Sequence, residues 1–231
     1  MLRGSIVFYW TDGRPPAVVA REARDAGVRR LAVKCGDSGR WWPQYRELAP
    51  HLDAMGIDRP AWAYCKPATL DGDARVAAEA RAAGAKAYIA DMEREYVGYP
   101  AAARLFGRLL RAHLGPDFPV YVTTFASPAV EPAFPWPEAA HFADGIIPQW
   151  YACAYPFGSM NAQIAASYRA VRAYGRPVLP AGPLYGRTTA VDVAALVDAA
   201  KREQMPAVLW WRYGLGTEAL LRQAASALPD A

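Results

Sequence analysis

The sequence predicts an α/β protein that folds as one (β/α)8 barrel, a TIM barrel, with residues 1–231 in a single domain. Three observations predict this fold. Short apolar or β-branched runs alternate with alanine-rich segments along the whole chain. The runs start roughly 25 to 32 residues apart, which is the length of one strand, one helix and two loops. No linker, low-complexity segment or shift in composition divides the chain.

The predicted strands are the eight short runs rich in valine, isoleucine, tyrosine and tryptophan, residue types that favour strands. They cover residues 5–10, 30–35, 60–65, 86–91, 119–124, 145–151, 177–181 and 206–211. An open doubly wound sheet would show the same alternation of strands and helices. That fold carries a G-x-G-x-x-G turn after its first strand, and no such turn follows the first run here. We therefore favour the closed barrel.

Prolines and glycines mark the ends of the helices between these runs. Pro100 opens a helix that ends at Gly115, the usual arrangement of these two residue types. Asp73 precedes an alanine-rich segment, 74–83, and we predict that it caps the start of that helix. A proline-rich loop over 124–137 is long enough to shape a cleft.

The charge pattern excludes one class of partner. The chain has a formal net charge of +4 at pH 7, which would favour an anionic surface. Its basic residues alternate with acids along predicted helices, as at 21–25, so we interpret them as solvated helix faces. No basic run with interleaved aromatic residues appears, and we expect no nucleic-acid partner.

Cysteine usage and apolar segments bear on the compartment. Cys35, Cys65 and Cys153 form no C-x-x-C pair, and we expect free buried thiols. The first residues lead into a strand without the apolar stretch of a secretory signal, and no segment reaches the roughly 18 to 20 apolar residues of a membrane span. We expect a soluble protein with no membrane partner, which would reach an extracellular or cell-wall target by signal-independent release. The sequence leaves the location and the oligomeric state open.

In barrels of this kind the functional site is built from the carboxyl ends of the strands and the loops that follow them. The residues at these predicted ends are mainly aromatic and polar. Those that we expect to contact a substrate are Trp10, Asp12, Lys34, Tyr64, Lys66, Tyr121, Gln149, Tyr151 and Trp211. Flat aromatic faces beside hydrogen-bonding groups suit sugar rings, whose C–H faces are apolar and whose hydroxyls need partners. The composition of this end therefore predicts a carbohydrate partner.

Two carboxylates, Asp91 and Glu93, end the fourth predicted strand. Residues i and i+2 of a strand point to the same face and lie roughly 6.6 Å apart, so these side chains should project together. Two carboxyl groups at such a separation do not ionise independently. Glu95 continues the alternation past the strand end, and we interpret it as a solvent-facing loop acid.

Other chemistries stay open at this point. Lys34, Lys66 or Arg212 would neutralise the two carboxylates in a structural ion network. Either lysine would also serve as a Schiff-base nucleophile if burial lowered its pKa. None of the three histidines stands at a strand end, so we expect no metal and no other cofactor.

The residues at two strand ends resemble a known family. Ile89-Ala90-Asp91-Met92-Glu93 resembles the D-x-E that ends strand four in family 25 glycoside hydrolases, the lysozymes that cut peptidoglycan between its amino sugars. Trp211-Arg212-Tyr213 is similar to the W-Q-Y of that family on strand eight. The chitinase-like family 18 also ends its fourth strand in D-x-E and has a tyrosine on strand six, where Tyr151 stands here.

The resemblance implies a metal-independent glycosidase that acts on an N-acetylated amino-sugar glycan by a retaining or substrate-assisted route. Glu93 would protonate the glycosidic oxygen, which requires a raised pKa, while Asp91 would stay ionised. Tyr151 would hold the acetamido group of the substrate, and Trp211 would form the floor of the sugar subsite. The close spacing of the acids fits this route better than an inverting one, whose carboxyls stand about 6.5 to 9.5 Å apart.

The chain departs from both families. It has no aspartate in the first predicted strand, where family 25 has one. It lacks the upstream aspartates of strand four in family 18, and it has Ala152 where that family has an aspartate after the strand-six tyrosine. The missing first-strand aspartate favours an alternative function, a hydrolase-like barrel that has lost turnover and acts as a glycan-binding module, whereas the retained pair of Asp91 and Glu93 opposes it.

Overall fold

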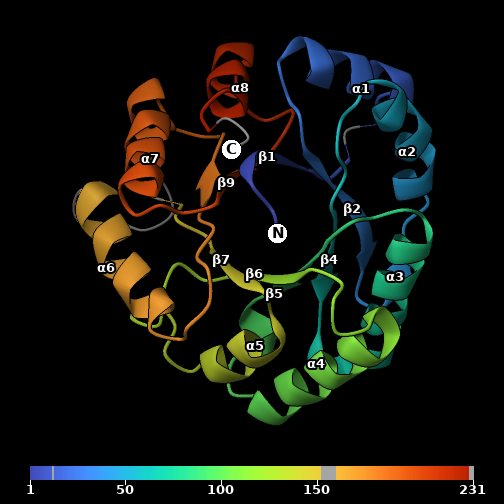
Figure 1. The fold of residues 1–231 in the computed structure, drawn as a ribbon, viewed down its shortest axis with the longest axis vertical. Coiled ribbons are helices and arrows are strands. Elements are labelled where there is room, and N and C mark those ends of the chain that lie inside the picture. Colours follow the sequence, from blue (N-terminus) through green and yellow to red (C-terminus); the bar gives the residue numbers. More distant parts are fainter. Residues whose placement is uncertain (12, 152–159, 229–231) are drawn as a thin grey trace.

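The computed structural model describes residues 1–11, 13–151 and 160–228 of the chain. In this part, strands surround a central axis and helices enclose the strands (Figure 1). The strands are β1 (Gly4–Tyr9), β2 (Leu31–Asp37), β3 (Arg40–Trp41), β4 (Ala61–Cys65), β5 (Tyr88–Met92), β6 (Val120–Thr124), β7 (Gly145–Pro148), β8 (Ala181–Pro183) and β9 (Ala207–Trp211). The helices are α1 (Pro16–Asp25), α2 (Gln44–Ala54), α3 (Leu70–Ala82), α4 (Pro100–Leu114), α5 (Trp136–Phe142), α6 (Met160–Arg172), α7 (Ala190–Arg202) and α8 (Glu218–Ala225).

The sheet closes into a ring of parallel strands. Its order is β7-β6-β5-β4-β2-β1-β9-β8, so the first and last strands of the chain, β1 and β9, lie side by side. Parallel bridges from Ile146 to Val178 and from Gln149 to Ala181 join the two ends of this order. The closed (β/α)8 barrel predicted from the alternation of runs is therefore confirmed.

Strands β3 and β8 differ most from the prediction, and β7 (Gly145–Pro148) ends before the predicted residue 151. The two-residue strand β3 pairs antiparallel with the end of β2 and is too short for sequence periodicity to reveal it. The seventh predicted strand covered 177–181, whereas regular pairing in β8 begins at Ala181. Pro177 and Pro180 have no N–H group to donate to a ladder, so Val178 makes only an isolated bridge.

The barrel has an inner core along its axis and an outer core between strands and helices. Ile6 and Ile89 belong to the inner core, while Val7, the residue after Ile6, packs in the outer core. Successive side chains of a strand point to opposite faces. Asp91, two residues after Ile89, therefore points inward at the carboxyl end of β5.

The helix ends mostly follow the predicted signals. α4 begins at Pro100, and Gly115, which follows its last residue, has a φ of 75°, a value that glycine adopts without strain. In the described part of the chain no helix combines the length and the apolar character that crossing a membrane requires. Cys35 and Cys65 are buried free thiols, as expected, and Cys153 lies outside the described residues.

Asp73 has a different role from the predicted helix cap. α3 begins at Leu70, so Asp73 lies inside the first turn of the helix, and its side chain is fully buried. Its carboxylate accepts hydrogen bonds from the backbone amides of Gly39 at 2.6 Å and Lys66 at 3.0 Å, and from the hydroxyl of Thr69 at 2.9 Å. Asp73 thereby joins the turn after β2 to the segment after β4, both at the carboxyl end of the barrel.

Candidate active site

A cavity of about 430 Å³ opens at the carboxyl end of the strands. It is lined by Trp10, Lys34, Asp37, Trp62, Tyr64, Lys66, Asp91, Glu93, Gln149, Tyr151 and Trp211. Most of the residues predicted from the strand ends therefore meet around one space.

The acid pair lies at the centre of this lining. Asp91 is the fourth residue of β5 and is 6% exposed, whereas Glu93 follows the strand and is half-buried. The side-chain amide of Gln149 donates a hydrogen bond to Oε1 of Glu93 at 2.7 Å, and its nitrogen lies 3.4 Å from Oδ1 of Asp91. Gln149, just after β7, thus contacts both carboxyl groups and holds them toward the cavity.

The protonation of the pair differs from the sequence-based expectation. Burial raises the pKa of Asp91 well above its ordinary value, and the charge of Glu93 and a hydrogen bond with it raise this pKa further. This direction opposes the expectation that Asp91 stays ionised and favours its protonated form in the resting site. A carboxyl pair that shares one proton offers both an acid and a base.

Lys34 is buried among aromatic rings beside this pair. It is 1% exposed, and its ammonium lies 2.6 Å from Oδ2 of Asp37. The same nitrogen lies 3.9, 4.4 and 5.0 Å from the ring centroids of Trp10, Trp42 and Trp62. A carboxylate and three aromatic faces all favour the charged amine, which is not a nucleophile. This environment argues against the Schiff-base alternative at Lys34.

The predicted ion network forms on a different carboxylate. Burial opposes ionisation of Asp37, but hydrogen bonds from Lys34 and Ser38 outweigh it and lower the pKa of this carboxyl. No ion pair joins Asp91 or Glu93 to a lysine or arginine within the described residues. The acid pair is therefore not neutralised by the network that we considered.

Tyr64 and Lys66 form one wall of the cavity, and Glu95 contacts Tyr64. The hydroxyl of Tyr64 donates to Oε2 of Glu95 at 2.5 Å, and the ammonium of Lys66 lies 5.5 Å from the centroid of the Tyr64 ring. Glu95 belongs to a short 3₁₀ turn, Arg94–Tyr96, and is half-buried. Its interpretation as a solvent-facing loop acid is wrong, because the turn directs it back toward β4.

Aromatic side chains form the remaining walls. The ring centroid of Trp211 lies 5.3 Å from that of Trp62 and 6.0 Å from that of Trp10, and its peptide bond to the next residue is cis. Tyr151 meets Tyr185 edge to face at 6.2 Å. Both Trp211 and Tyr151 are half-buried, so each leaves part of a ring toward the cavity.

One predicted site residue lies away from the cavity, and another falls outside the described residues. Tyr121 pairs with Ile89, two residues before the level of Asp91, and its ring is fully buried in the inner core. Its hydroxyl accepts a hydrogen bond from the amide of Leu2 at 2.6 Å. The expected substrate contact of Tyr121 is wrong, because the strand register places this residue one layer below the cavity. Asp12 lies outside the described residues.

Two lining residues were not selected from the sequence. β2 extends to Asp37, two residues beyond its predicted end, and this extension brings the Asp37 carboxylate to the cavity. Trp62 lies two residues before Tyr64 on β4, so strand alternation alone would place both on the same face.

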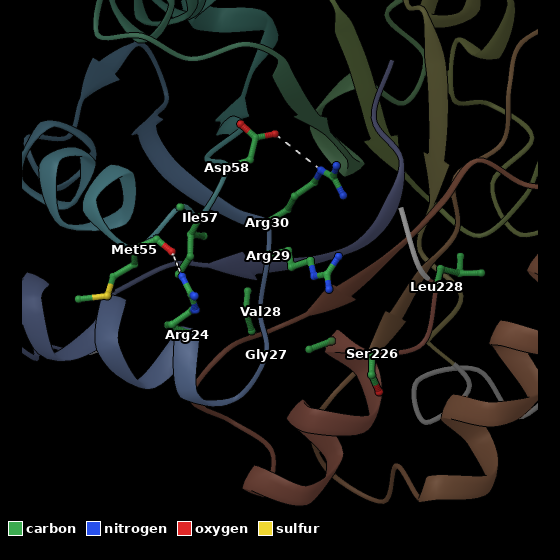
Figure 2. Close-up of a pocket in the computed structure, with 12 residues that line it drawn as sticks. Arg24, Gly27, Val28, Arg29, Arg30, Met55, Ile57, Asp58, Ser226 and Leu228 are labelled. Carbon is green, nitrogen blue, oxygen red and sulfur yellow. Dashed lines mark hydrogen bonds and ion pairs between the residues drawn. The ribbon is translucent and has the colours of Figure 1, made fainter. Parts of the chain in front are cut away.

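A larger cavity, about 750 Å³, lies at the opposite end of the barrel (Figure 2). Its lining comes from the loops before β2 and β4 and from the segment after α8. Arg30 pairs with Asp58 at 3.7 Å, and Arg24 donates to the carbonyl of Met55. Active sites of such barrels form at the carboxyl end, so the smaller cavity is the candidate active site. No group of three or more His, Cys, Asp or Glu side chains is placed to bind a metal in the part of the chain described.

The comparisons with known proteins identify the fold. No protein-family model matches the chain, and no curated protein matches it. Solved structures do match. The spore cortex-lytic enzyme SleL of Bacillus cereus superposes with a TM-score of 0.76 at 10% sequence identity, covering 99% of this chain and 75% of that chain.

Two further matches are family 18 glycoside hydrolases. An N-acetylglucosaminidase from Paenibacillus barengoltzii gives a TM-score of 0.70 at 12% identity, covering 96% of this chain and 99% of that chain. A fungal endo-β-N-acetylglucosaminidase gives 0.69 at 16% identity, covering 99% of both chains. At these identities the likeness shows the fold alone, a barrel of the type found in glycoside hydrolases. These neighbours support the resemblance to family 18 and give no specific support to family 25.

Proposed function

We propose that this protein is a glycoside hydrolase that cleaves an N-acetylated amino-sugar glycan such as peptidoglycan. The observation that carries the proposal is the pair of buried Asp91 and half-buried Glu93, bridged by Gln149 in a cavity with aromatic walls and in no ion pair with a described lysine or arginine. The names of the structural neighbours support the substrate class, since they include a cortex-lytic enzyme and two N-acetylglucosaminidases.

The proposed mechanism uses the single proton of the pair. This proton passes from Asp91 to Glu93, and Glu93 donates it to the glycosidic oxygen as the bond to the anomeric carbon breaks. Asp91, now ionised, stabilises the positive charge that develops as the acetamido oxygen of the substrate bonds to that carbon. Water then attacks the same carbon, the bond from the acetamido oxygen to that carbon breaks, and the proton that the water loses goes to Glu93. Tyr151 holds the acetamido group, and Trp211 supports the sugar ring.

The direct test measures new reducing ends after incubation with peptidoglycan or chitooligosaccharides. We expect release by the wild type, and a rate at least about 100-fold lower in Glu93→Gln, the low end of general acid–base contributions. Glu218→Gln makes the same chemical change on the exposed helix α8 and should retain full activity. Equal rates in Glu93→Gln and the wild type would contradict the assignment of Glu93 as the acid.

The alternative function is a glycan-binding module without turnover. It is favoured by the composition of β1, Gly4–Tyr9, which contains no carboxylate where family 25 enzymes carry one. Retention on the insoluble glycan without release of reducing ends, in the wild type and Glu93→Gln alike, would select this alternative.

Identification of the glycosidic bond that is cleaved makes the proposal more specific. The resemblance to family 25 implies a muramidase, whose products carry N-acetylmuramic acid at the new reducing end. The likeness to family 18 implies N-acetylglucosamine at that end instead. Reduction of the peptidoglycan products with borohydride, followed by mass spectrometry, identifies the reducing-end sugar and decides between the two.

A further inference from the structure

Lys34 is a charged side chain of the cavity that the proposed hydrolysis does not use. It lines the same space as Asp91 while only 1% of it is exposed. Burial of an ammonium group is unfavourable unless fixed partners offset the loss of hydration. Here Asp37 and the rings of Trp10 and Trp62, with that of Trp42, supply those partners.

The cage around Lys34 is anchored to the backbone of the barrel. The side-chain amide of Gln44 donates to the carbonyl of Trp10 at 2.5 Å and to that of Lys34 at 2.8 Å. The indole nitrogen of Trp62 donates to the carbonyl of Tyr9 at 3.0 Å. These bonds join β1, β2, β4 and the start of α2. The ammonium group of Lys34 is therefore held in a fixed position in the lining of the cavity.

We propose that Lys34 is a positioning residue whose fixed ammonium restricts the Asp91–Glu93 pair to one shared proton. The proposal rests on the proposed function, because the pair is the acid–base machinery of the hydrolysis. Repulsion between the two carboxylates favours binding of the first proton to the pair, and the nearby ammonium group disfavours binding of a second proton. In a singly protonated pair, one carboxyl group can donate a proton while the other carries a negative charge.

The charges around the pair are consistent with this role. Among the described residues, the charged and titratable groups that line the cavity with the pair are Lys34 and Asp37 from β2, Tyr64 and Lys66 from the end of β4, and Tyr151 after β7. Glu95, from the turn after β5, accepts a hydrogen bond from Tyr64. Burial and Glu93 raise the pKa of Asp91, Lys34 lowers it, and Asp37 has a smaller raising effect than these. The neighbour on β7, Gln149, is neutral.

The test titrates the side-chain carboxyl of Asp91 by carbon-13 NMR, with the signal assigned through Asp91→Asn. In Lys34→Met we expect the pKa of Asp91 to rise by about one unit, a tenfold tighter hold on the proton, which is the low end for loss of a neighbouring charge. Lys86→Met removes an exposed lysine before the start of β5 and should leave the titration unchanged. An unchanged titration in folded Lys34→Met protein would overturn the proposal.

A second variant covers the case in which Lys34→Met does not fold. Lys34→Met combined with Asp37→Asn removes both members of the ion pair and leaves no unpaired buried charge. Because Lys34 and Asp37 act on Asp91 in opposite directions, its pKa should lie between those of the wild type and Lys34→Met. A value at or below that of the wild type would contradict the proposal.

The hydrolysis assay gives an independent readout. In Lys34→Met both limbs of the pH profile of kcat/KM should move to higher pH, because each protonation step of the pair becomes more favourable. A merely structural role would lower the rate at every pH without moving the limbs, and that result would overturn the proposal. The NMR titration needs no turnover. A wild type that releases no reducing ends would therefore defeat the proposed function, while the titration still decides whether Lys34 sets the charge of the pair.

Discussion

Both ends of this barrel carry a cavity with charged side chains, but the charges are satisfied in different ways. At the amino-terminal end, Arg30 and Asp58 pair directly, with side chains that are 20% and 38% exposed (Figure 2). At the carboxyl end, Asp91 is 6% exposed, and its hydrogen-bonding neighbours are an amide and a second acid. Partly exposed pairs are energetically nearly neutral, whereas a buried carboxyl without a cation takes up a proton.

This difference distinguishes the cavity at the amino-terminal end of the barrel from the candidate active site at the carboxyl end. In the larger cavity, Arg30 pairs with Asp58, and Arg24 donates to the carbonyl of Met55. In the smaller cavity, burial and the charge of Glu93 raise the pKa of Asp91 well above its ordinary value. Burial without a partner cation, rather than cavity size or charge count, marks the candidate active end.

The largest expected effect is that of Asp91→Asn. Its rate of glycan hydrolysis should fall at least about 100-fold, because the pair loses its shared proton. The stability should change in the opposite direction at neutral pH. Because the folded pKa of Asp91 lies above the unfolded value of about 3.9, the native state binds more protons between the two values, and the wild type loses stability as the pH rises through that window.

Asparagine carries no such pH-dependent penalty. The free energy of unfolding of Asp91→Asn relative to the wild type should therefore rise with pH above about 4, as measured by urea denaturation across a pH series. The same pH dependence in both proteins would show that Asp91 ionises normally, and the contrast between the two ends would be lost.

A smaller effect is expected at Asp73, which joins two loops of the carboxyl end. Asp73→Ala removes the acceptor of three hydrogen bonds and leaves the amides of Gly39 and Lys66 without it, so we expect a destabilisation of about 3 kcal/mol in chemical denaturation. Asp73→Asn keeps one oxygen that accepts hydrogen bonds, so it should lose less stability than Asp73→Ala. Asp198→Ala, on the exposed face of α7, should stay within about 0.5 kcal/mol of the wild type. Equal losses in Asp73→Ala and Asp198→Ala would refute the bridging role.

The smallest effect is expected at the amino-terminal end. Asp58→Asn removes the charge that pairs with Arg30 but keeps the oxygen that accepts from the amide of Arg59 at 3.1 Å. We expect a change of less than about 1 kcal/mol in the free energy of unfolding, and an unchanged rate of hydrolysis. A several-fold loss of hydrolysis would show that the two ends are coupled and would break the comparison.

Local periodicity accounts for what could be predicted of the site. The alternation of runs predicted the barrel, and the spacing of Asp91 and Glu93 predicted a shared direction, since both follow from geometry within one strand. The same rule failed at Glu95, because the backbone leaves the extended conformation in the 3₁₀ turn Arg94–Tyr96. It also failed at Tyr121, because the level of a residue along the barrel axis depends on the register between strands.

The sequence by itself determined the barrel, the end that bears the acids and the aromatic character of that end. Each of these depends on residue types and spacing within one strand or one βα unit. Only the tertiary structure decided that Lys34 pairs with Asp37, that Gln149 bridges Asp91 and Glu93, and that burial raises the pKa of Asp91. Those features depend on burial and on distances between strands far apart in the chain, and these quantities exist only once the barrel closes.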